Sequence, residues 1–410
     1  MKVELRLKDL GIYKTGLTYS PDNLCEPNEG ILVLRSANIQ NDKIDLNDCV
    51  YVNNKIESNM YVRKGDILVC SRNGSANLVG KTAIIEKDMN ATWGAFMMLL
   101  RTNYNSKYIN YLLNAAIRKG KGRFATSTIN QLTNSMLGGI HVEIFTEDEE
   151  QQRIVDYLDA KLGKIDARTA ILVKQQDAYA RLKKSVIHHA VTRGLNPNVS
   201  LKDSGVEWIG MIPEHWEVKR IKELCSFVSR GATPNYVDEG EYKVMNQAVF
   251  STGNLNHKVV RYSSYMKSES QIKKGDLLIA STGGGVLGKL YFFDDEDLNF
   301  YADTHVTIVR SEKGLFCVKF LFYLLSYQFD MVNACMAKGS TNQTELQRDC
   351  LLSYELAIPS LVEQQTIIAY LDEKCAKIDT ATEIIGKQID ALKRLKRALI
   401  NEVVTGQHAV

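Results

Sequence analysis

One segment of the sequence occurs twice, and this duplication constrains the fold more than any other feature. Glu150-Gln151-Gln152 recurs 213 positions later as Glu363-Gln364-Gln365, and Tyr157-Leu158-Asp159 recurs at the same separation as Tyr370-Leu371-Asp372. Because the separation stays constant, the segment was duplicated without insertion or deletion. Self-similarity at a fixed period means that one structural unit is built more than once.

The segments that precede the two copies also match, although more loosely. Lys64-Gly65-Asp66 parallels Lys274-Gly275-Asp276, and Ser127-Thr128 parallels Ser340-Thr341. The order is therefore variable block, helix, variable block, helix. We predict similar domains at residues 1–146 (block one) and 200–362 (block two), a long helix with its linker at 147–199, and a second long helix at 363–410. A duplicated frame with diverged blocks indicates two similar tasks on two different targets.

The duplicated segment itself is predicted to be one long helix. It has no proline between residues 147 and 191, and apolar residues fall at every seventh position in both copies. This period is typical of a helix with a narrow apolar seam. At about 1.5 Å per residue, the first helix spans roughly 65 Å. The seam consists of Leu158, Ile165, Leu172, Tyr179, Val186, Leu371, Ile378, Ile385, Leu392 and Leu399.

Neither seam is wide enough to bury itself. We therefore expect each helix to cover the other in an antiparallel coiled coil with pseudo-two-fold symmetry. The same stripe could instead bind another protein. The two interpretations are compatible, because the outer faces of the helices stay free.

Both blocks combine short β-rich runs with helical patches, and turn residues bound each run. This mixture predicts an α+β fold with a mixed, twisted sheet in each block. The expected strands are 31–34, 66–70, 82–86, 96–101, 276–280, 290–293 and 305–310, and the expected helices are 107–118 and 318–336.

Two glycine-rich stretches look like phosphate-binding loops, but each departs from the pattern. Leu290 follows Lys289 where Ser or Thr is required, and the stretch from Gly74 to Thr82 has one residue too many before Gly80. Strand-like residues follow both. We interpret each stretch as a β-turn that presents Lys81 or Lys289 at the surface. No hydrolase, zinc-peptidase or deaminase pattern occurs, so we predict a non-catalytic chain.

The eight cysteines are scattered and lack the spacing of a zinc site. Unpaired cysteines in a long chain are typical of the reducing cytosol, where they act as small buried apolar residues. No apolar run approaches the length of a membrane span, and the first residues do not resemble a signal peptide. We expect a cytoplasmic protein that holds no metal and no cofactor.

Groups suited to DNA contact occur at matching places in the two blocks, although the net charge of +3 is a weak signal. Basic and hydroxyl side chains can neutralise phosphates and fix register. Arg suits guanine edges, and Asn or Gln suits adenine edges. Each of these groups could equally belong to a solvated polar loop. Candidate phosphate contacts are Lys81, Arg118, Lys119, Lys121, Arg123, Thr126, Ser127, Thr128, Lys289, Lys338, Ser340, Thr341 and Asn342, and candidate base readers are Arg72, Asn73, Asn246 and Gln247.

Residues 202–220, KDSGVEWIGMIPEHWEVKR, resemble the signature that opens a target-recognition domain in the specificity subunits of type I restriction-modification systems. The run Glu363-Gln364-Gln365, followed by Tyr370-Leu371-Asp372, is similar to the second conserved helix of that family, and the first copy is similar to the first helix. The Ser204–Trp208 pattern does not occur before block one, where the similarity starts near residues 7–10. The resemblance covers essentially the whole chain.

This resemblance implies a DNA sequence-recognition subunit without catalytic activity. Each block would be a target-recognition domain for one half of a bipartite site in double-stranded DNA. The helices would set the spacer and dock two modification (methyltransferase) subunits. Restriction (translocase and endonuclease) subunits would complete the complex, with S-adenosylmethionine, ATP and Mg²⁺ bound by the partners.

Two other classes of function remain possible from the sequence. A coiled-coil scaffold could carry two lobes that bind proteins rather than DNA. A nucleotide-dependent nuclease could use the glycine-rich turns, in which case Lys81 and Lys289 would be essential for its activity.

Overall fold

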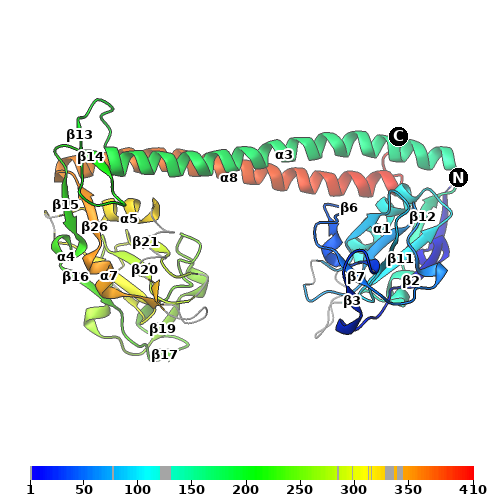
Figure 1. Cartoon of the computed structure of the whole chain (residues 1–410), viewed down its shortest axis with the longest axis horizontal. Helices are drawn as coiled ribbons and strands as arrows, with labels where there is room; N and C mark the ends of the chain where they lie inside the picture. Colours follow the sequence, from blue (N-terminus) through cyan, green and yellow to red (C-terminus); the bar gives the residue numbers. More distant parts are fainter. Residues whose placement is uncertain are drawn as a thin grey trace. The chain divides into compact units, whose positions relative to one another are not determined.

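A computed structural model describes residues 2–75, 78–120, 131–283, 286–297, 299–312, 314, 316–327 and 345–410, and the backbone of 337–338. The chain divides into two compact units. Unit 1 comprises Met1–Val173 with Gly386–Val410, and unit 2 comprises Lys174–Ile385. Each unit holds one block and one end of each of two long helices (Figure 1).

The duplicated segments form the two longest helices, α3 (Asp148–Arg193) and α8 (Leu361–Val404). Asp148, Glu149 and Glu150 stand in the first turn of α3, where negative charge favours the helix dipole. Gly194 follows α3 with φ of 74°, and Gly406 follows shortly after α8 with φ of 67°. These left-handed conformations are readily adopted by glycine and are typical of helix C-termini.

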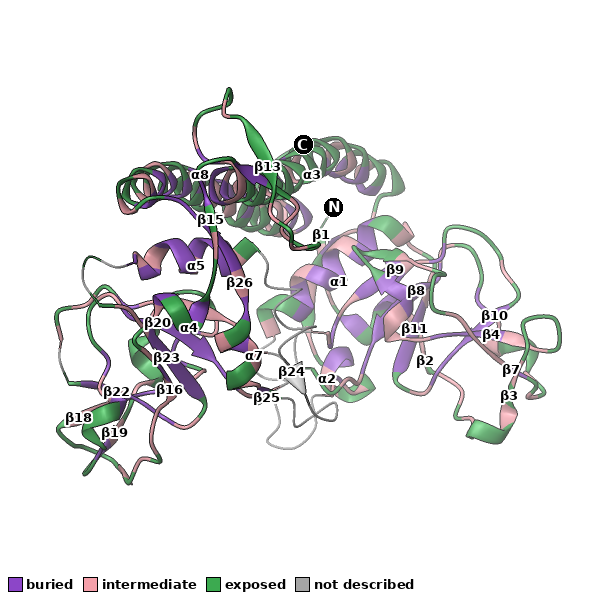
Figure 2. Ribbon diagram, turned by 60° about the vertical axis from the view of Figure 1, so that its left-hand side comes forward, coloured by how far each residue is buried: buried purple, intermediate pink, exposed green. Residues whose placement is uncertain are grey.

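The long helices pack antiparallel in both units. In unit 1 the Lys396 ammonium lies 2.8 Å from Asp166, and in unit 2 the Lys183 ammonium lies 2.7 Å from Asp379. Both pairs join equivalent positions of the duplicated segment, as a pseudo-two-fold arrangement requires. The outer surfaces of α3 and α8 are largely exposed (Figure 2). The ten residues of the expected seam are buried at Leu158, Leu172, Leu371, Ile378 and Ile385, and partly buried at Ile165, Tyr179, Val186, Leu392 and Leu399.

Block one contains two four-stranded sheets, in the orders β10-β4-β7-β3 and β2-β11-β8-β9. The β10–β4 pair is parallel and the other pairs are antiparallel, so the first sheet is mixed. The elements are β1 (Lys2–Arg6), β2 (Gly11–Thr15), β3 (Leu24–Cys25), β4 (Ile31–Leu34), β5 (Ile39–Gln40), β6 (Lys43–Ile44), β7 (Val50–Val52), β8 (Ile67–Cys70), β9 (Thr82–Ile84), β10 (Ala91–Trp93), β11 (Met97–Thr102), α1 (Ser106–Gly120), α2 (Asn134–Gly138) and β12 (His141–Phe145).

Block two repeats this plan with sheets β17-β19-β18-β22 and β16-β23-β20-β21, and its parallel pair is β18–β22. The α+β prediction is therefore confirmed. The elements are β13 (Leu201–Asp203), β14 (Met211–Pro213), β15 (Glu217–Arg220), α4 (Ile221–Leu224), β16 (Phe227–Arg230), β17 (Tyr236–Val237), β18 (Tyr242–Met245), β19 (Arg261–Ser263), β20 (Leu277–Ala280), β21 (Leu290–Phe292), β22 (Phe300–Ala302), β23 (Val306–Arg310), α5 (Val318–Tyr327), β24 (Ala337–Lys338), β25 (Glu345–Leu346), α7 (Arg348–Ser353) and β26 (Glu355–Ile358). Residues 328–336, expected to extend the helix at 318, lie outside the described residues.

The repeated Lys-Gly-Asp motif is a turn that buries a carboxylate. Asp276 is 1% exposed at its side chain, accepts a 2.7 Å hydrogen bond from the Lys273 amide, and pairs with Arg310 at 2.6 Å. Asp66 makes the same contacts in unit 1, with the Arg63 amide at 2.8 Å and with Arg101 at 2.6 Å. Because each arginine donates through two nitrogens, the pair ties β23 to the turn before β20, or β11 to the turn before β8.

The repeated Glu-Gln-Gln motif fastens each block to its long helix. Gln364 is 2% exposed, donates to the Pro359 carbonyl at 3.0 Å and accepts from the Cys317 amide at 3.0 Å. In unit 1, Gln151 donates to the Phe145 carbonyl at 2.7 Å and accepts from the Asn105 amide at 2.9 Å. Each glutamine therefore satisfies two backbone groups at once, a carbonyl at the end of a strand and an amide just before a helix.

The repeated Tyr-Leu-Asp motif adds a second fastening two turns further along. Asp159 accepts from the Tyr111 hydroxyl at 2.6 Å and pairs with Lys107 at 2.7 Å. Asp372 does the same with Tyr323 at 2.6 Å and Lys319 at 2.8 Å. Burial and the neighbouring carboxylate both raise the pKa of each tyrosine, so the hydroxyls remain donors at neutral pH.

Asp276→Ala is expected to lower the free energy of unfolding by about 3 kcal/mol. Removing one partner of a buried pair leaves the other charge uncompensated, and the partial exposure of Arg310 keeps the loss at the low end of the usual range. Urea denaturation measures the change. Glu296→Ala, which removes an 84% exposed carboxylate 2.6 Å from Lys274, is the control and should change stability by less than about 0.5 kcal/mol. Equal losses would contradict the structural role of Asp276.

Gln364→Ala is expected to cost about 1–3 kcal/mol, because the Cys317 amide and the Pro359 carbonyl lose their partner. Hydrogen exchange at the Cys317 amide should accelerate in the same variant. The adjacent Gln365 is exposed, so Gln365→Ala is a matched control with no expected change in either measurement. Unchanged hydrogen exchange at the Cys317 amide in Gln364→Ala would refute the role of Gln364 in fastening the block to α8.

Candidate DNA interface

Polar and aromatic side chains meet in unit 1 where β4 and β8 end and β11 begins. The Asn73 amide donates to the Ser36 hydroxyl at 3.0 Å, and an Arg72 terminal nitrogen donates to Gln131 Oε1 at 3.3 Å. The Arg72 guanidinium lies 5.6 Å from the centroid of the Phe96 ring, and that ring is 58% exposed. We name Ser36, Arg72, Asn73, Phe96 and Gln131 the strand-end cluster of unit 1.

Unit 2 has a cluster at the equivalent place. The Thr282 hydroxyl lies 2.7 Å from His305 Nδ1 and 3.2 Å from Gln247 Oε1. Thr282 also forms a backbone bridge to Glu345, as Arg72 does to Gln131. We name Gln247, Thr282, His305 and Glu345 the strand-end cluster of unit 2.

Backbone hydrogen bonds establish this equivalence. The Ser71 amide donates to the Phe96 carbonyl at 3.0 Å, and the Ser281 amide donates to the His305 carbonyl at 2.8 Å. In unit 1 the Gly94 amide donates to the Leu34 carbonyl, and in unit 2 the Asp303 amide donates to the Met245 carbonyl. Position by position, Arg72 therefore matches Thr282, Phe96 matches His305, and Ser36 matches Gln247. The backbone frame is shared, but the side chains presented on it differ completely.

The electrostatics of the two clusters also differ. Among the described residues, the buried Arg72 Nε has no hydrogen-bond partner, while a terminal nitrogen of the same guanidinium donates to Gln131. In unit 2, burial raises the pKa of Asp303, whose carboxylate accepts from the His305 amide at 2.8 Å and so holds the backbone of that loop. One cluster thus offers a cation beside an exposed ring, and the other offers hydroxyl, imidazole and amide groups together with the Glu345 carboxylate.

The structure brings Arg72, Asn73 and Gln247 into these clusters but places other predicted residues elsewhere. Asn246 accepts from the Ala248 amide at 2.9 Å and so caps its own turn. The Lys289 ammonium donates to the Ser251 carbonyl at 2.6 Å, and Lys81 is partly buried in the equivalent turn. Arg118 and Lys119 are exposed in the last turn of α1.

Lys338 lies on β24, where its backbone pairs in register with that of Glu345 of the unit 2 cluster. Lys121, Arg123, Thr126, Ser127, Thr128, Ser340, Thr341 and Asn342 lie outside the described residues.

Sequence reasoning missed Ser36, Phe96, Gln131, Thr282, His305 and Glu345. Strand pairing places them, and that pairing joins segments far apart in the chain. One usable signal was present, since Phe96 and His305 both stand directly before an apolar strand that begins with Met97 or Val306.

The described residues of the glycine-rich turns do not build a nucleotide site. Gly80 and Gly288 adopt φ of 84° and 76°, and the turns lead into β9 and β21. A phosphate-binding loop requires a helix N-terminus at that point.

No helix in the described part of the chain has the length and apolar character needed to cross a bilayer. Within the same residues, no group of three His, Cys, Asp or Glu side chains is arranged to hold a metal ion. The seven described cysteines are unpaired. Burial raises the pKa of Cys70 to about 11 and that of Cys225 to about 12, which keeps both thiols protonated and unreactive.

Comparison with known proteins assigns this architecture to a class. The model of the type I restriction modification DNA specificity domain matches residues 2–174 and 213–394, and the chain belongs to that family. The predicted non-catalytic DNA sequence-recognition subunit is thereby confirmed, and the scaffold alternative is not favoured.

Relatives align along nearly the whole chain. The StySPI specificity subunit of Salmonella potsdam is 20% identical over 96% of this chain and 86% of its own length. The EcoKI specificity subunit of Escherichia coli K12 is 22% identical over the same shares. A chain from a solved type I restriction-modification system has the same fold, with a TM-score of 0.73 at 16% identity over 99% of this chain and 98% of that one.

Proposed function

We propose that each unit reads one half of a bipartite duplex site with its strand-end cluster. The observation that carries this proposal is that equivalent backbone hydrogen bonds hold different side chains in the two clusters. Two readers of unlike half-sites require this combination, because base edges differ while the duplex backbone does not.

The side chains of each cluster suit base edges. Arg72 has the forked donors that match guanine O6 and N7, and the exposed Phe96 ring can contact a thymine methyl group. In unit 2, Gln247 can pair with adenine N6 and N7, while Thr282 and His305 supply further hydrogen-bonding groups. We assign phosphate contacts to Arg118 and Lys119 instead, because both are exposed cations.

Arg72→Ala is expected to relax sequence recognition in one half of the site and leave the other half intact. Loss of a bidentate contact costs about 1–3 kcal/mol of discrimination at one base pair. Mapping methylated bases in cells that carry the variant with its partner subunits measures the change. Arg63→Ala is the matched control, because it removes the same charge from an exposed position of the same unit outside the cluster. A uniform loss of affinity with unchanged sequence preference would instead make Arg72 a phosphate contact.

The helices support a proposal about partners. Ile171 and Ile384 are equivalent positions on α3 and α8, and each is 50% exposed. Leu182 and Leu395 are likewise equivalent, at 47% and 53% exposed. Unit 1 therefore has exposed Ile171 and Leu395, and unit 2 has the equivalent Ile384 and Leu182. Matched sets of exposed apolar side chains suit two copies of one partner, which we assign to two modification subunits.

On this proposal the catalytic groups belong to the partners. S-adenosylmethionine would be held by the modification subunits, and ATP with Mg²⁺ by the restriction subunits. This chain would contribute sequence recognition and the distance between half-sites.

Deleting one heptad from each helix, residues 172–178 from α3 and 385–391 from α8, is expected to shorten the spacer. Seven helical residues span about 10.5 Å, which corresponds to about three base pairs of duplex. The seam stays in phase because a whole heptad is removed. Methylome sequencing should show the same bases at a shorter spacing. Lys174→Ala, which changes the same heptad without changing its length, is the control, and an unchanged spacer in the deletion variant would refute the ruler.

A further inference from the structure

Three side chains of the unit 2 cluster form a run of hydrogen bonds with a defined direction. The Thr282 hydroxyl lies 3.2 Å from Gln247 Oε1 and 2.7 Å from His305 Nδ1. An amide oxygen can only accept, and a hydroxyl has a single hydrogen to donate. Thr282 therefore donates to Gln247 and accepts from His305, so Nδ1 carries the imidazole proton. We name this run, from His305 Nδ1 through the Thr282 hydroxyl to Gln247 Oε1, the relay.

The surrounding backbone holds the relay in place. The His305 amide donates to the buried Asp303 carboxylate at 2.8 Å, and the Ser281 amide donates to the His305 carbonyl at 2.8 Å. Gln247 lies against Gly283, where an added Cβ would come within 3.1 Å of the Gln247 Nε2 atom. The imidazole and the amide are therefore positioned by contacts within the protein, before a ligand is present.

The outer nitrogens of the relay have opposite hydrogen-bonding character. In a neutral imidazole with its proton on Nδ1, the Nε2 atom is an acceptor. His305 is exposed, and its Nε2 has no hydrogen-bond partner among the residues that the structure describes. The Gln247 Nε2 atom is a donor, and it likewise has no partner within the described part of the chain. The relay therefore makes His305 an acceptor beside a donor from Gln247.

The Glu345 carboxylate is the other acceptor in this cluster. Glu345 pairs with Arg230 at 3.1 Å, so it already has a charged partner. In unit 1 the position of His305 is occupied by Phe96, whose side chain has no nitrogen or oxygen atom. The imidazole acceptor is thus confined to unit 2, and the two half-sites should differ at the base that it contacts.

We propose that His305 Nε2 accepts a hydrogen bond from the exocyclic amino group of a base in the half-site of unit 2, and that Thr282 enforces this by fixing the tautomer. In the major groove only adenine N6 and cytosine N4 are amino groups, whereas guanine and thymine present acceptors. His305 therefore selects adenine or cytosine, and Thr282 is a positioning residue. The inference rests on the proposed function, because it requires the unit 2 cluster to meet base edges.

NMR of the full chain with labelled histidine nitrogens measures the tautomer directly. The His305 signals are identified by their loss in His305→Phe, a change that the equivalent Phe96 of unit 1 shows the frame to accept. At about pH 8, where an ordinary histidine is neutral, we expect the proton on Nδ1. Thr282→Val should abolish this preference, and Thr282→Ser should retain it. A proton on Nε2 in the unaltered chain would overturn the proposal.

Competition binding tests which base is read. The complex of this chain with its partner subunits is titrated at constant salt with its own duplex site, identified by mapping methylated bases. Competitor duplexes lose one exocyclic amino group in the half-site, through purine in place of adenine or pyrimidin-2-one in place of cytosine. At one position the loss should weaken binding by about tenfold with the unaltered chain and by less than about twofold with His305→Phe. That position distinguishes adenine from cytosine.

The positioning role of Thr282 is read at the same base. Thr282→Val should reduce the effect of the missing amino group to about threefold or less, and Thr282→Ser should keep the full effect. Thr252→Val removes an exposed hydroxyl of the same unit outside the cluster and should change nothing.

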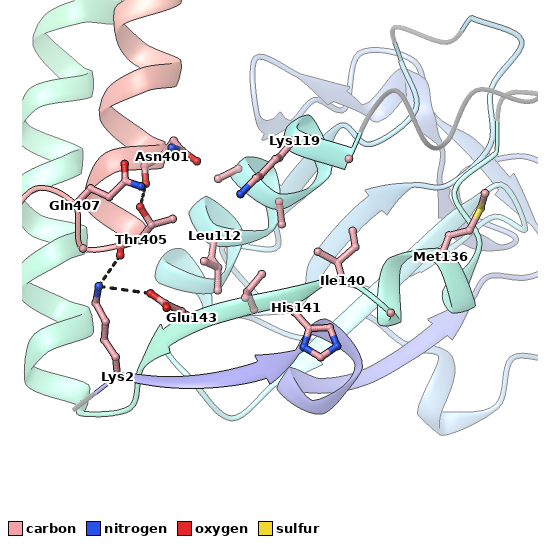
Figure 3. Close-up of a pocket in the computed structure, with 16 residues that line it drawn as sticks. Lys2, Leu112, Lys119, Met136, Ile140, His141, Glu143, Asn401, Thr405 and Gln407 are labelled. Carbon is pink, nitrogen blue, oxygen red and sulfur yellow. Dashed lines mark hydrogen bonds and ion pairs between the residues drawn. The ribbon is translucent and has the colours of Figure 1, made fainter.

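His141 provides the matched control for His305. It lies on β12 in the wall of a pocket of unit 1 (Figure 3). Its Nδ1 is also bonded, at 3.2 Å from the Glu4 carboxylate. His141→Phe therefore removes an exposed imidazole outside both strand-end clusters, and discrimination should stay unchanged at every base.

The outcomes separate this inference from the function on which it rests. If no base in either half-site depends on His305, Thr282 or Gln247, the unit 2 cluster does not read DNA, and both proposals fail. If His305→Phe relaxes recognition of guanine or thymine, the cluster reads DNA but the assigned acceptor is wrong. An amino group whose effect disappears in Glu345→Gln and persists in His305→Phe would likewise overturn this inference alone.

Discussion

The buried glutamine near the start of each long helix is the contact on which the placement of each block depends. Gln151 and Gln364 use both ends of their amide on backbone groups, so rotation of the block about the helix would break two directional bonds at once. The tyrosine and lysine contacts to Asp159 and Asp372 resist the same motion from another direction. A block fixed in this way follows the length and phase of its helix.

Because the blocks are fixed to the helices, pairing of the helices along the heptad seam also orients the blocks. A seam alone would hold two helices together, but it would not orient anything attached to them. Here the motifs that fasten the blocks lie in the same duplicated segment as the seam. Pseudo-two-fold pairing, shown by Lys396 with Asp166 and Lys183 with Asp379, therefore applies to the fastenings as well. The duplication therefore repeats the same set of contacts and produces two equivalent attachment points.

Periodicity and repetition were sufficient to predict the helices, the seam and the α+β blocks, because these features depend on residues close in sequence. The purpose of Glu-Gln-Gln and Lys-Gly-Asp was not predictable, since their partners, such as Cys317 and Arg310, are distant in sequence. The strand-end clusters were predicted in part. Arg72 and Gln247 follow strands directly, whereas Phe96 and His305 join them only through the pairing of β11 with β8 and β23 with β20. Lys289, predicted to contact DNA, donates to the Ser251 carbonyl, a partner distant in sequence that the pattern could not indicate.

Comparison of the two units separates positions that must stay from positions that can change. Asp66 and Asp276, with their arginine partners, are identical in both copies, because an unpaired buried charge is costly. Arg72 and Thr282 occupy equivalent backbone positions in the two units, but one side chain is a guanidinium and the other a hydroxyl. Both are only partly buried, and replacing such residues changes stability little. Recognition can therefore diverge at the strand ends without loosening the frame that holds them.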